Sequence, residues 1–228
     1  MKNVFNDFYQ GYDNWYQTTV GQFVAEQEAQ TLDALLQPQA EQKILEIGCG
    51  TGHFTLEMVQ KGCRITGIDQ APKMLQQAQT KLSAYSKQVQ LQIMDAQKLA
   101  YADNQFDSVF SMATLEFITD PQVAYHQMYR VVKPGGTIVL GTIQKGSAWA
   151  DFYESPACRG TAYEYAHFLT LKQIQNWDLQ HFASAQQCLF LPPNLPESEY
   201  NSTNEKNAQK TNSIGGFVCL KFRKSAAN

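Results

Sequence analysis

The chain has 228 residues, of which 43% are hydrophobic and 17% are charged, and its formal net charge is −3. This length and composition are typical of one globular domain with a substantial core. Neither a basic run nor an apolar stretch of about 20 residues occurs in the sequence. We therefore expect no nucleic-acid partner, no membrane-spanning helix and no stable membrane association.

The N-terminal sequence MKNVFNDFYQ lacks the basic segment followed by an apolar segment that is typical of a signal peptide. This favours a cytoplasmic protein. Five cysteines are scattered along the chain without a CxxC pair. Their odd number and wide spacing argue against a disulfide framework and a zinc site, so we expect no metal.

The first half of the chain alternates between helix and strand patterns. Residues 1–20 are rich in aromatic side chains and precede an apolar pattern at helical spacing, which Pro38 ends. Short apolar runs flanked by turn residues then indicate buried strands. In chain order the predicted elements are helix 21–36, strand 43–48, helix 53–62, strand 64–69, helix 71–86 and strand 89–96.

The second half continues the alternation and then changes character. Asp120 and Pro121 are typical of a helix start, while the polar residues 192–213 lack periodicity and indicate a loop. The predicted elements are strand 106–117, helix 120–132, a turn at 133–136, strand 137–143, helix 170–182, strand 185–191 and strand 215–224. This alternation indicates an α/β fold with a mostly parallel sheet covered by helices on both faces. Only a loop joins the last two strands, which favours antiparallel pairing between them.

Three glycines follow the first strand in the sequence ILEIGCGTGHF. Gly48, Gly50 and Gly52 lie at a strand–helix turn, where missing Cβ atoms let a ligand approach the backbone and the helix N-terminus favours an anion. Asp69 ends the second strand and suits the two hydroxyl groups of a ribose. The alternative interpretation is a tight turn without ligand. A dinucleotide site prefers GxGxxG, and His53 occupies the place of its third glycine, which disfavours an NAD-dependent oxidoreductase.

Several segments together resemble the class I S-adenosylmethionine-dependent methyltransferases, in their small-molecule (type 11-like) branch. The similar segments are ILEIGCGTGHFT, GIDQAPKML, MDAQKLAYADNQFDSVFSMATLEFITDP, MYRVVKPGGTIVLGT and SIGGFVCLKFRK. The resemblance covers nearly the whole chain. It implies a Rossmann-like, doubly wound, seven-stranded sheet with an antiparallel last strand, and S-adenosylmethionine as cofactor with S-adenosylhomocysteine as product.

The resemblance also assigns residues to the cofactor. The glycine turn would line its methionyl part with Glu46 nearby, Asp69 would hold the ribose, and the segment around Asp95 would contact the adenine. Met74 and Met94 equally suit core packing. The expected cofactor-binding residues are Tyr12, Glu46, Gly48, Cys49, Gly50, Thr51, Gly52, Asp69, Gln70, Met74, Met94, Asp95, Ala96, Ser111, Met112 and Leu115.

The N-terminal YDNWY sequence resembles a segment that closes over the cofactor in similar methyltransferases. Tyr12 and Tyr16 are the candidates for this lid, since aromatic rings beside a sulfonium contribute about 0.5–2 kcal/mol each. The alternative is an N-terminal helix packed on the sheet. Tyr12, Tyr16 and Glu116 are the candidate catalytic residues, with His167 as a further candidate base. The alternative interpretation of Glu116 is a solvated residue in a helix or loop.

We expect a single domain over residues 1–228. It would comprise an N-terminal helical lid (1–36), a cofactor-binding core (37–143) and acceptor-side segments (144–228) that include the flexible loop 192–213 and the final strand. The expected reaction is in-line methyl transfer to a small-molecule acceptor by a monomer or homodimer. The alternatives are a metalloid or quinone-type methyltransferase, or a non-catalytic protein that binds S-adenosylmethionine.

Overall fold

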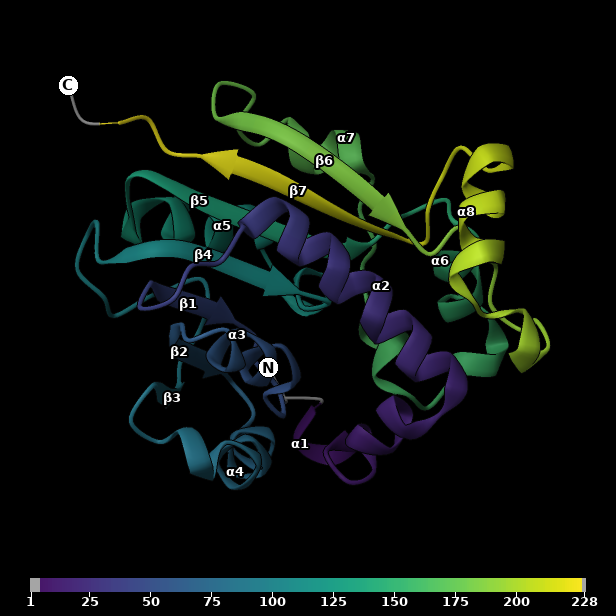
Figure 1. The fold of residues 1–228 in the computed structure, drawn as a ribbon, viewed down its shortest axis with the longest axis horizontal. Coiled ribbons are helices and arrows are strands. Elements are labelled where there is room, and N and C mark those ends of the chain that lie inside the picture. Colours follow the sequence, from purple (N-terminus) through teal and green to yellow (C-terminus); the bar gives the residue numbers. More distant parts are fainter. Residues whose placement is uncertain (1–4, 227–228) are drawn as a thin grey trace.

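The structure, a computed structural model, describes residues 5–226. Its centre is a seven-stranded sheet of order β3-β2-β1-β4-β5-β7-β6. Strands β1 to β5 are mutually parallel, and β7 lies antiparallel between β5 and β6 (Figure 1). The strands are β1 (Lys43–Ile47), β2 (Arg64–Asp69), β3 (Val89–Ile93), β4 (Phe106–Met112), β5 (Val132–Ile143), β6 (Phe182–Cys188) and β7 (Phe217–Arg223).

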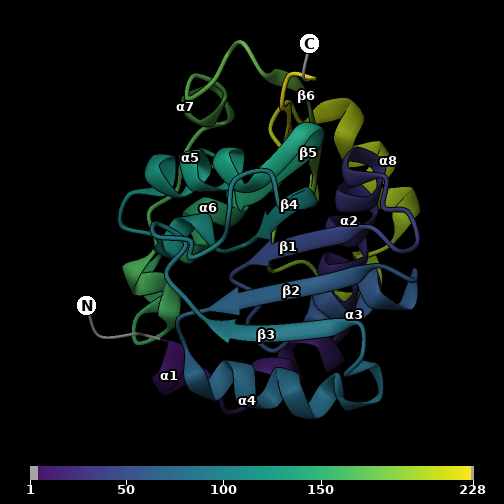
Figure 2. The same ribbon diagram turned by 90° about the vertical axis from the view of Figure 1, so that its left-hand side faces the viewer.

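Helices cover both faces of the sheet, which confirms the predicted fold class (Figure 2). Helices α2, α3 and α4 bury their apolar sides on one face, and α5 and α7 bury theirs on the other. The helices are α1 (Phe5–Phe8), α2 (Thr19–Leu36), α3 (His53–Gln60), α4 (Pro72–Lys81), α5 (Pro121–Val131), α6 (Ala148–Tyr153), α7 (Leu171–Gln175) and α8 (Ser202–Thr211).

The two-residue period of the strands divides the core into two halves. In β1, Ile44 faces the side of α2 and α3, while Leu45 and Ile47 face α5. All three side chains are fully buried. Burial of one such side chain contributes about 1.5–3 kcal/mol, so the central strands hold the two layers together.

Helix starts follow the local signals in the sequence. Asp120 caps α5 by accepting a hydrogen bond from the Val123 amide at 3.1 Å, with Pro121 at the first helical position. Thr170 forms a capping box with Gln173 at the start of α7. The second of these helices, α7, ends at Gln175, earlier than the predicted residue 182, and turns lead from there to the start of β6 at Phe182.

The prediction of a loop over residues 192–213 was wrong for its second half. Helix α8 occupies Ser202–Thr211, capped by the Asn201 side chain at the Asn204 amide. Only Glu205 of this helix is buried, where its carboxylate accepts from the Phe190 and Leu191 amides. A helix held by a cap and one carboxylate has no apolar stripe, so the sequence pattern carries no helical period.

The predicted N-terminal helical lid over residues 1–36 divides into two parts. Helix α2 packs across β5, β6 and β7 as a layer of the core, with Phe23, Leu32 and Leu35 buried (Figure 1). Residues 5–17 precede it as the short helix α1 and the 3₁₀-helix η1 (Tyr12–Gln17). Residues 1–4 of the predicted lid lie outside the described residues. Among the described residues, no helix combines the length and apolar character needed to cross a membrane.

Candidate active site

Four parallel strands end side by side at one edge of the sheet. The strand order reverses between β1 and β4, and at such a point the loops diverge and leave a crevice. The glycine turn follows β1, Asp69 ends β2, Met94 follows β3 and Ala113 follows β4. The structure thus brings the segments of the predicted cofactor site together at this edge.

The three glycines of the turn have different surroundings. All three have positive φ angles, 72° for Gly48, 51° for Gly50 and 79° for Gly52. A Cβ added to Gly48 would lie 2.2 Å from the Thr114 side chain, and one on Gly52 would lie 2.8 Å from Leu82. A Cβ on Gly50 would meet nothing within 4 Å. Only Gly50 therefore opens onto free space, while the other two glycines allow internal packing.

Asp69 is tied to this turn. Its Oδ2 accepts a hydrogen bond from the Gly50 amide at 2.9 Å, and its Oδ1 accepts from the Ala71 amide at 2.7 Å. Burial raises the pKa of this carboxyl above its ordinary value, although the backbone hydrogen bonds lower it in part. Each carboxylate oxygen keeps a second lone pair, which suits the two hydroxyl groups of a ribose.

Glu46 lies on β1 beneath the turn and faces α3. Its side chain is buried and accepts a hydrogen bond from the Thr55 hydroxyl. Burial raises its pKa to about 8, with the charge of Asp69 acting in the same direction. This carboxyl thereby links β1 to the first turn of α3 behind the glycine turn.

The remaining predicted cofactor residues differ in what they expose. Thr51 joins the N-terminal segment by a hydrogen bond described below, and Cys49 packs its sulfur against Gly67. Gln70 and Asp95 are exposed, Met94 is half-buried and Ala96 is buried. Asp95 accepts a hydrogen bond from the Gln97 amide at 2.8 Å, which leaves its second oxygen available.

Four predicted cofactor residues direct their side chains into the protein. Met74 and Leu115 are buried, the Ser111 hydroxyl donates to the Ile47 carbonyl, and the Met112 sulfur lies 4.0 Å from the Cys219 sulfur. Met74 therefore fits the alternative of core packing. Ser111, Met112 and Leu115 offer only backbone atoms to the crevice.

The segment before α2 lies over this edge and contacts both sides of it. Asp13 accepts a hydrogen bond from the Thr51 hydroxyl at 2.6 Å and forms an ion pair with Lys81 of α4 at 2.9 Å. Phe5 contacts Phe117, beyond the end of β4, with ring centroids 4.8 Å apart. We call residues 5–17 the N-terminal cover, since they bridge the loops after β1 and β4.

Both predicted lid tyrosines lie in the N-terminal cover. Their ring centroids are 6.0 Å apart, and burial raises the pKa of Tyr12 to about 12 and that of Tyr16 well above its ordinary value. Neither hydroxyl is therefore a ready base near neutral pH. Tyr16 stacks on His53 with centroids 4.0 Å apart, and Trp15 is 40% exposed.

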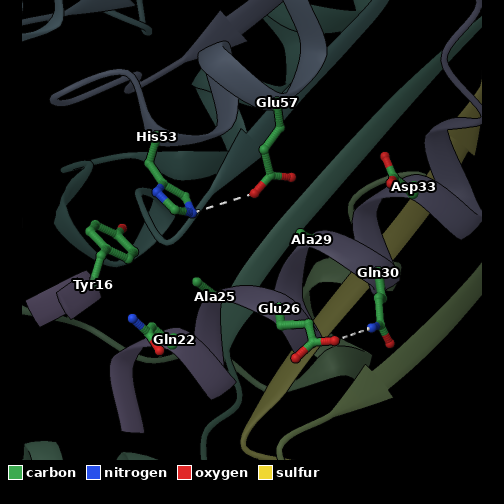
Figure 3. A pocket seen from close by; sticks show the side chains of 9 residues that line it. All are labelled: Tyr16, Gln22, Ala25, Glu26, Ala29, Gln30, Asp33, His53 and Glu57. Carbon is green, nitrogen blue, oxygen red and sulfur yellow. Dashed lines mark hydrogen bonds and ion pairs between the residues drawn. The ribbon is translucent and has the colours of Figure 1, made fainter. Parts of the chain in front are cut away.

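His53 begins α3, and burial lowers its pKa to about 4. Its ring lies 3.5 Å from a Glu57 oxygen, beside a cavity of about 360 Å³ between α2 and α3 (Figure 3). Figure 3 shows Tyr16 and His53 at one end of this cavity and Asp33 at the other. Neither Gly50 nor Asp69 lines it, so this cavity is separate from the predicted cofactor site.

Glu116 is not a solvated residue, so that alternative was wrong. Its side chain is 1% exposed, and its Oε1 accepts from the Thr142 hydroxyl at 2.8 Å and the Ile143 amide at 2.7 Å. Its Oε2 is buried without a partner among the described residues. His167 contributes its amide to the Glu116 carbonyl at 2.8 Å, but its side chain is exposed.

Sequence reasoning missed two acidic residues of this region. Asp13 was part of the YDNWY segment, yet only its tyrosines were singled out. Glu28 lies on α2 in the buried stripe formed with Val24 and Leu32 and is itself 8% exposed. A charged residue within an apolar helical stripe was the available signal. Among residues 5–226, no group of three or more His, Cys, Asp or Glu side chains is arranged to hold a metal ion.

Comparison with known proteins agrees with this geometry. Residues 45–140 match the family model described as a methyltransferase domain. The chain is 28% identical over 198 residues to an uncharacterised Mycobacterium tuberculosis protein, covering 85% of this chain and 66% of the relative. It is 31% identical over 145 residues to the ubiquinone biosynthesis O-methyltransferase of Klebsiella pneumoniae, covering 59% of each chain. The chain thus spans two thirds or less of the length of these curated relatives.

Two solved structures illustrate the fold similarity. A Thermotoga maritima S-adenosylmethionine-dependent methyltransferase, described as a possible histamine N-methyltransferase, has a TM-score of 0.75 at 24% identity and covers 99% of this chain and 100% of its own. Phosphoethanolamine N-methyltransferase 2 of Haemonchus contortus, in complex with S-adenosyl-L-methionine, has a TM-score of 0.66 at 18% identity and covers 96% of this chain and 60% of its own.

The strand order, the glycine turn with Asp69 and the family match define a methyltransferase of the S-adenosylmethionine-dependent class. Residues 45–140 thus carry a methyltransferase domain on the fold of the S-adenosylmethionine-dependent methyltransferases, and S-adenosylmethionine is the cofactor that this family match and fold indicate.

Proposed function

We propose that this protein transfers the methyl group of S-adenosylmethionine to a small-molecule acceptor by in-line displacement. The observation that carries the proposal is the pairing of Gly50 with Asp69 at the point where the strand order reverses. Gly50 combines a left-handed backbone with free space, and Asp69 presents a carboxylate beside it. This arrangement fits a ribose and the chain attached to it, as the cofactor requires.

In the proposal, Asp69 binds the ribose hydroxyls, and Asp95 with the Ala96 amide binds the adenine. Glu46 keeps the glycine turn and the start of α3 in place, and the backbone of Ser111 to Leu115 borders the methyl group. The sulfonium supplies an activated leaving group, so alignment of the acceptor can provide about 7–11 kcal/mol of the rate acceleration. The N-terminal cover excludes water from this edge.

The acceptor side is formed by aromatic residues that follow β5. Tyr153 of α6 and Tyr163 stack with ring centroids 3.9 Å apart. The ring of Phe117, which follows β4, lies next to them, with its centroid 5.9 Å from that of Tyr163. Together with Tyr12 from the N-terminal cover, they suit a small acceptor with apolar surface. A macromolecular acceptor would need an open face at the place that the cover occupies.

A second candidate function is O-methylation of a quinone-type hydroxyl. It is favoured by the similarity to the ubiquinone biosynthesis O-methyltransferase and by the stacked tyrosines, which suit a flat ring. The two functions differ in the acceptor and share the cofactor. A metalloid acceptor receives less support, because burial raises the pKa of both Cys158 and Cys188.

The test measures cofactor binding and methyl transfer separately. Calorimetry with S-adenosylhomocysteine comes first, followed by incubation with methyl-labelled S-adenosylmethionine and fractionated cell extract. We expect label in the small-molecule pool. Label in the lipid pool would favour the quinone-type acceptor. Label in protein or nucleic acid would overturn the acceptor class, and cofactor binding without any label would favour a non-catalytic binding protein.

A further inference from the structure

Two buried carboxyl groups, Glu28 and Glu116, lie on elements that border the proposed acceptor side. Glu116 follows β4 directly, and its Oε2 is buried without a partner among the described residues. Glu28 projects from α2, is 8% exposed and takes part in no hydrogen bond or ion pair among residues 5–226. Glu116 is hydrogen-bonded to Thr142 and Ile143 of β5, and α2, which carries Glu28, packs against the same strand. The charge of Glu116 accordingly raises the pKa of Glu28.

Among residues 5–226, no basic side chain pairs with either carboxyl group. The groups whose charges act on Glu28 are Glu116 and Glu57, both acidic, and the described ion pairs include neither Glu28 nor Glu116. Burial of an unpaired carboxylate is costly, so such a pair needs either protons or an external cation. The unfavourable free energy of burying these carboxyl groups is therefore located next to the proposed acceptor side.

A series of aromatic ring contacts runs from the N-terminal cover, through Phe117 next to Glu116, to Tyr163 and Tyr153. The ring centroids are 6.0 Å apart for Tyr16–Tyr12, 6.4 Å for Tyr12–Phe5, 4.8 Å for Phe5–Phe117, 5.9 Å for Phe117–Tyr163 and 3.9 Å for Tyr163–Tyr153. The charge of Glu28 acts on Tyr12, Tyr16 and Tyr153, and that of Glu116 acts on Tyr163. The charge of Asp69 also acts on Tyr12, so the aromatic group adjoins the proposed ribose site. Aromatic faces attract cations, and their attraction strengthens when water is excluded. Carboxyl groups that lack a paired cation and lie beside several tyrosine rings are complementary to an ammonium group.

We propose that the methyl acceptor is an amine, whose ammonium group binds between Glu28 and Glu116. The aromatic side chains of Tyr12, Tyr16, Tyr153 and Tyr163 would line this site. This rests on the proposed methyl-transfer function and specifies its substrate class. The hydrogen bonds from Thr142 and Ile143 hold Oε1 of Glu116 in place, so the unpartnered Oε2 is the atom that receives the ammonium.

The same pair accounts for the proton that the reaction must remove. An ammonium nitrogen has no free electron pair, so one N–H proton passes to the Glu28 carboxylate and leaves a neutral amine. The nitrogen lone pair forms the new N–C bond while the methyl C–S bond breaks, and its electron pair stays on sulfur. The product is a methylated ammonium, and Glu28 returns its proton to water when the site opens.

The first test compares ligands by calorimetry in the presence of S-adenosylhomocysteine. The probes are 2-phenylethylamine, hexylamine and 1,4-diaminobutane, each with the alcohol in which hydroxyl replaces one amino group. We expect at least one amine to bind tenfold more tightly than its alcohol. If no amine binds more tightly than its alcohol, or if only hydroxyl compounds become methylated, the proposal is wrong.

The second test uses Glu28→Gln and Glu116→Gln, with Glu26→Gln as control, since Glu26 is exposed on the same helix. Each buried variant should weaken amine binding at least tenfold and leave S-adenosylhomocysteine binding within twofold. The control should change neither. Because each variant removes an uncompensated buried carboxyl, the ligand-free melting temperature should not fall, which separates this role from a structural one.

A third readout follows the proton. The titratable groups around the pair are Glu57 of α3, Tyr12 and Tyr16 of the N-terminal cover, Tyr153 of α6, Tyr163, Cys188 of β6 and Cys219 of β7. At pH 7 we expect amine binding to release a proton from Glu28, observed as a binding enthalpy that depends on the buffer.

The outcomes separate the two proposals. A protein that binds no S-adenosylhomocysteine would contradict the proposed function itself. A protein that binds it, but whose Glu28→Gln and Glu116→Gln variants lose cofactor affinity as much as amine affinity, would assign the carboxyl pair to the cofactor. Unchanged amine affinity in both variants would also overturn the inference.

Discussion

Gly50 and Gly48 separate ligand binding from packing within one turn. Gly50→Ala places a methyl group in free space, so the main cost to stability is the left-handed backbone, about 1–2 kcal/mol. Gly48→Ala adds a clash with Thr114 to that cost, and overpacking costs about 1–3 kcal/mol more.

We expect Gly50→Ala to fold and to bind S-adenosylhomocysteine at least tenfold more weakly, while Gly48→Ala loses more thermal stability. Melting curves and calorimetry of the two variants check this. Equal loss of stability in both, with unchanged affinity in Gly50→Ala, would contradict the assignment of Gly50 to the ligand.

Asp69 is the side chain on which the proposed ribose contact depends. We expect Asp69→Ala to weaken binding of S-adenosylmethionine at least tenfold, equivalent to about 1.4 kcal/mol. Because Asp69 also holds the Gly50 amide, a binding assay with adenine alone serves as control and should change little. An unchanged dissociation constant for the full cofactor would remove Asp69 from the site.

At the scale of elements, the N-terminal cover is held by the contacts of Asp13, by further hydrogen bonds from α4 to Asn6 and Tyr9, and by several ring contacts. Asp13→Asn removes the charge that pairs with Lys81. We expect faster dissociation of S-adenosylhomocysteine and faster proteolysis before residue 18 in the ligand-bound protein. The cofactor should still bind, since its proposed contacts lie on the strand ends.

Asp33→Asn is a matched control for this prediction. Asp33 also pairs with a lysine, Lys61, and its side chain has the same 37% exposure as that of Asp13. The control joins α2 to α3 away from the strand ends and should leave the dissociation rate unchanged. Equal rates in both variants and the unsubstituted protein would show that the cover does not retain the ligand.

The sequence predicts the elements with a strong apolar period and fails where tertiary contacts replace it. Strand β1 and helix α5 were correctly located because their burial pattern and caps are local. Helix α8 was missed because its one buried side chain, Glu205, binds amides from a distant segment.

The same limit applies to the site. Gly50 and Asp69 were found because a turn and a strand end place them predictably. The charge of Glu28 within the apolar stripe of α2 was a local signal that was overlooked, but the relation of Glu28 to Glu116 depends on how α2 crosses the sheet. Helix packing geometry has no local sequence signal. Residues such as Glu28 and Glu116, which come from distant elements, can therefore be recognised as neighbours only in the folded chain.

At the scale of the molecule, the buried carboxyl groups make stability depend on pH. Burial raises the pKa of Glu28 and Glu46 to about 8 from an ordinary value of 4.5. Between these values the folded protein binds more protons than the unfolded chain, so stability falls as pH rises. Each pKa unit corresponds to about 1.4 kcal/mol.

We therefore expect the free energy of unfolding of the ligand-free protein to decrease between pH 5 and pH 9. Urea titrations across this range check the sign. Glu28→Gln should flatten the dependence, and the exposed Glu26→Gln should not. A stability that rises over this interval would contradict the assignment of raised pKa values to these groups.

The placement of β7 sets the order in which the sheet can be completed. Strand β6 pairs only with β7 among the described strands, and β7 pairs with β5. During synthesis, β6 therefore emerges from the ribosome before it has any neighbour in the sheet, and β5 presents an unpaired apolar edge. Such edges promote association between chains. Only the synthesis of β7 covers the edge of β5 and gives β6 a partner. The nascent chain is therefore most prone to incorrect association before β7 has been made.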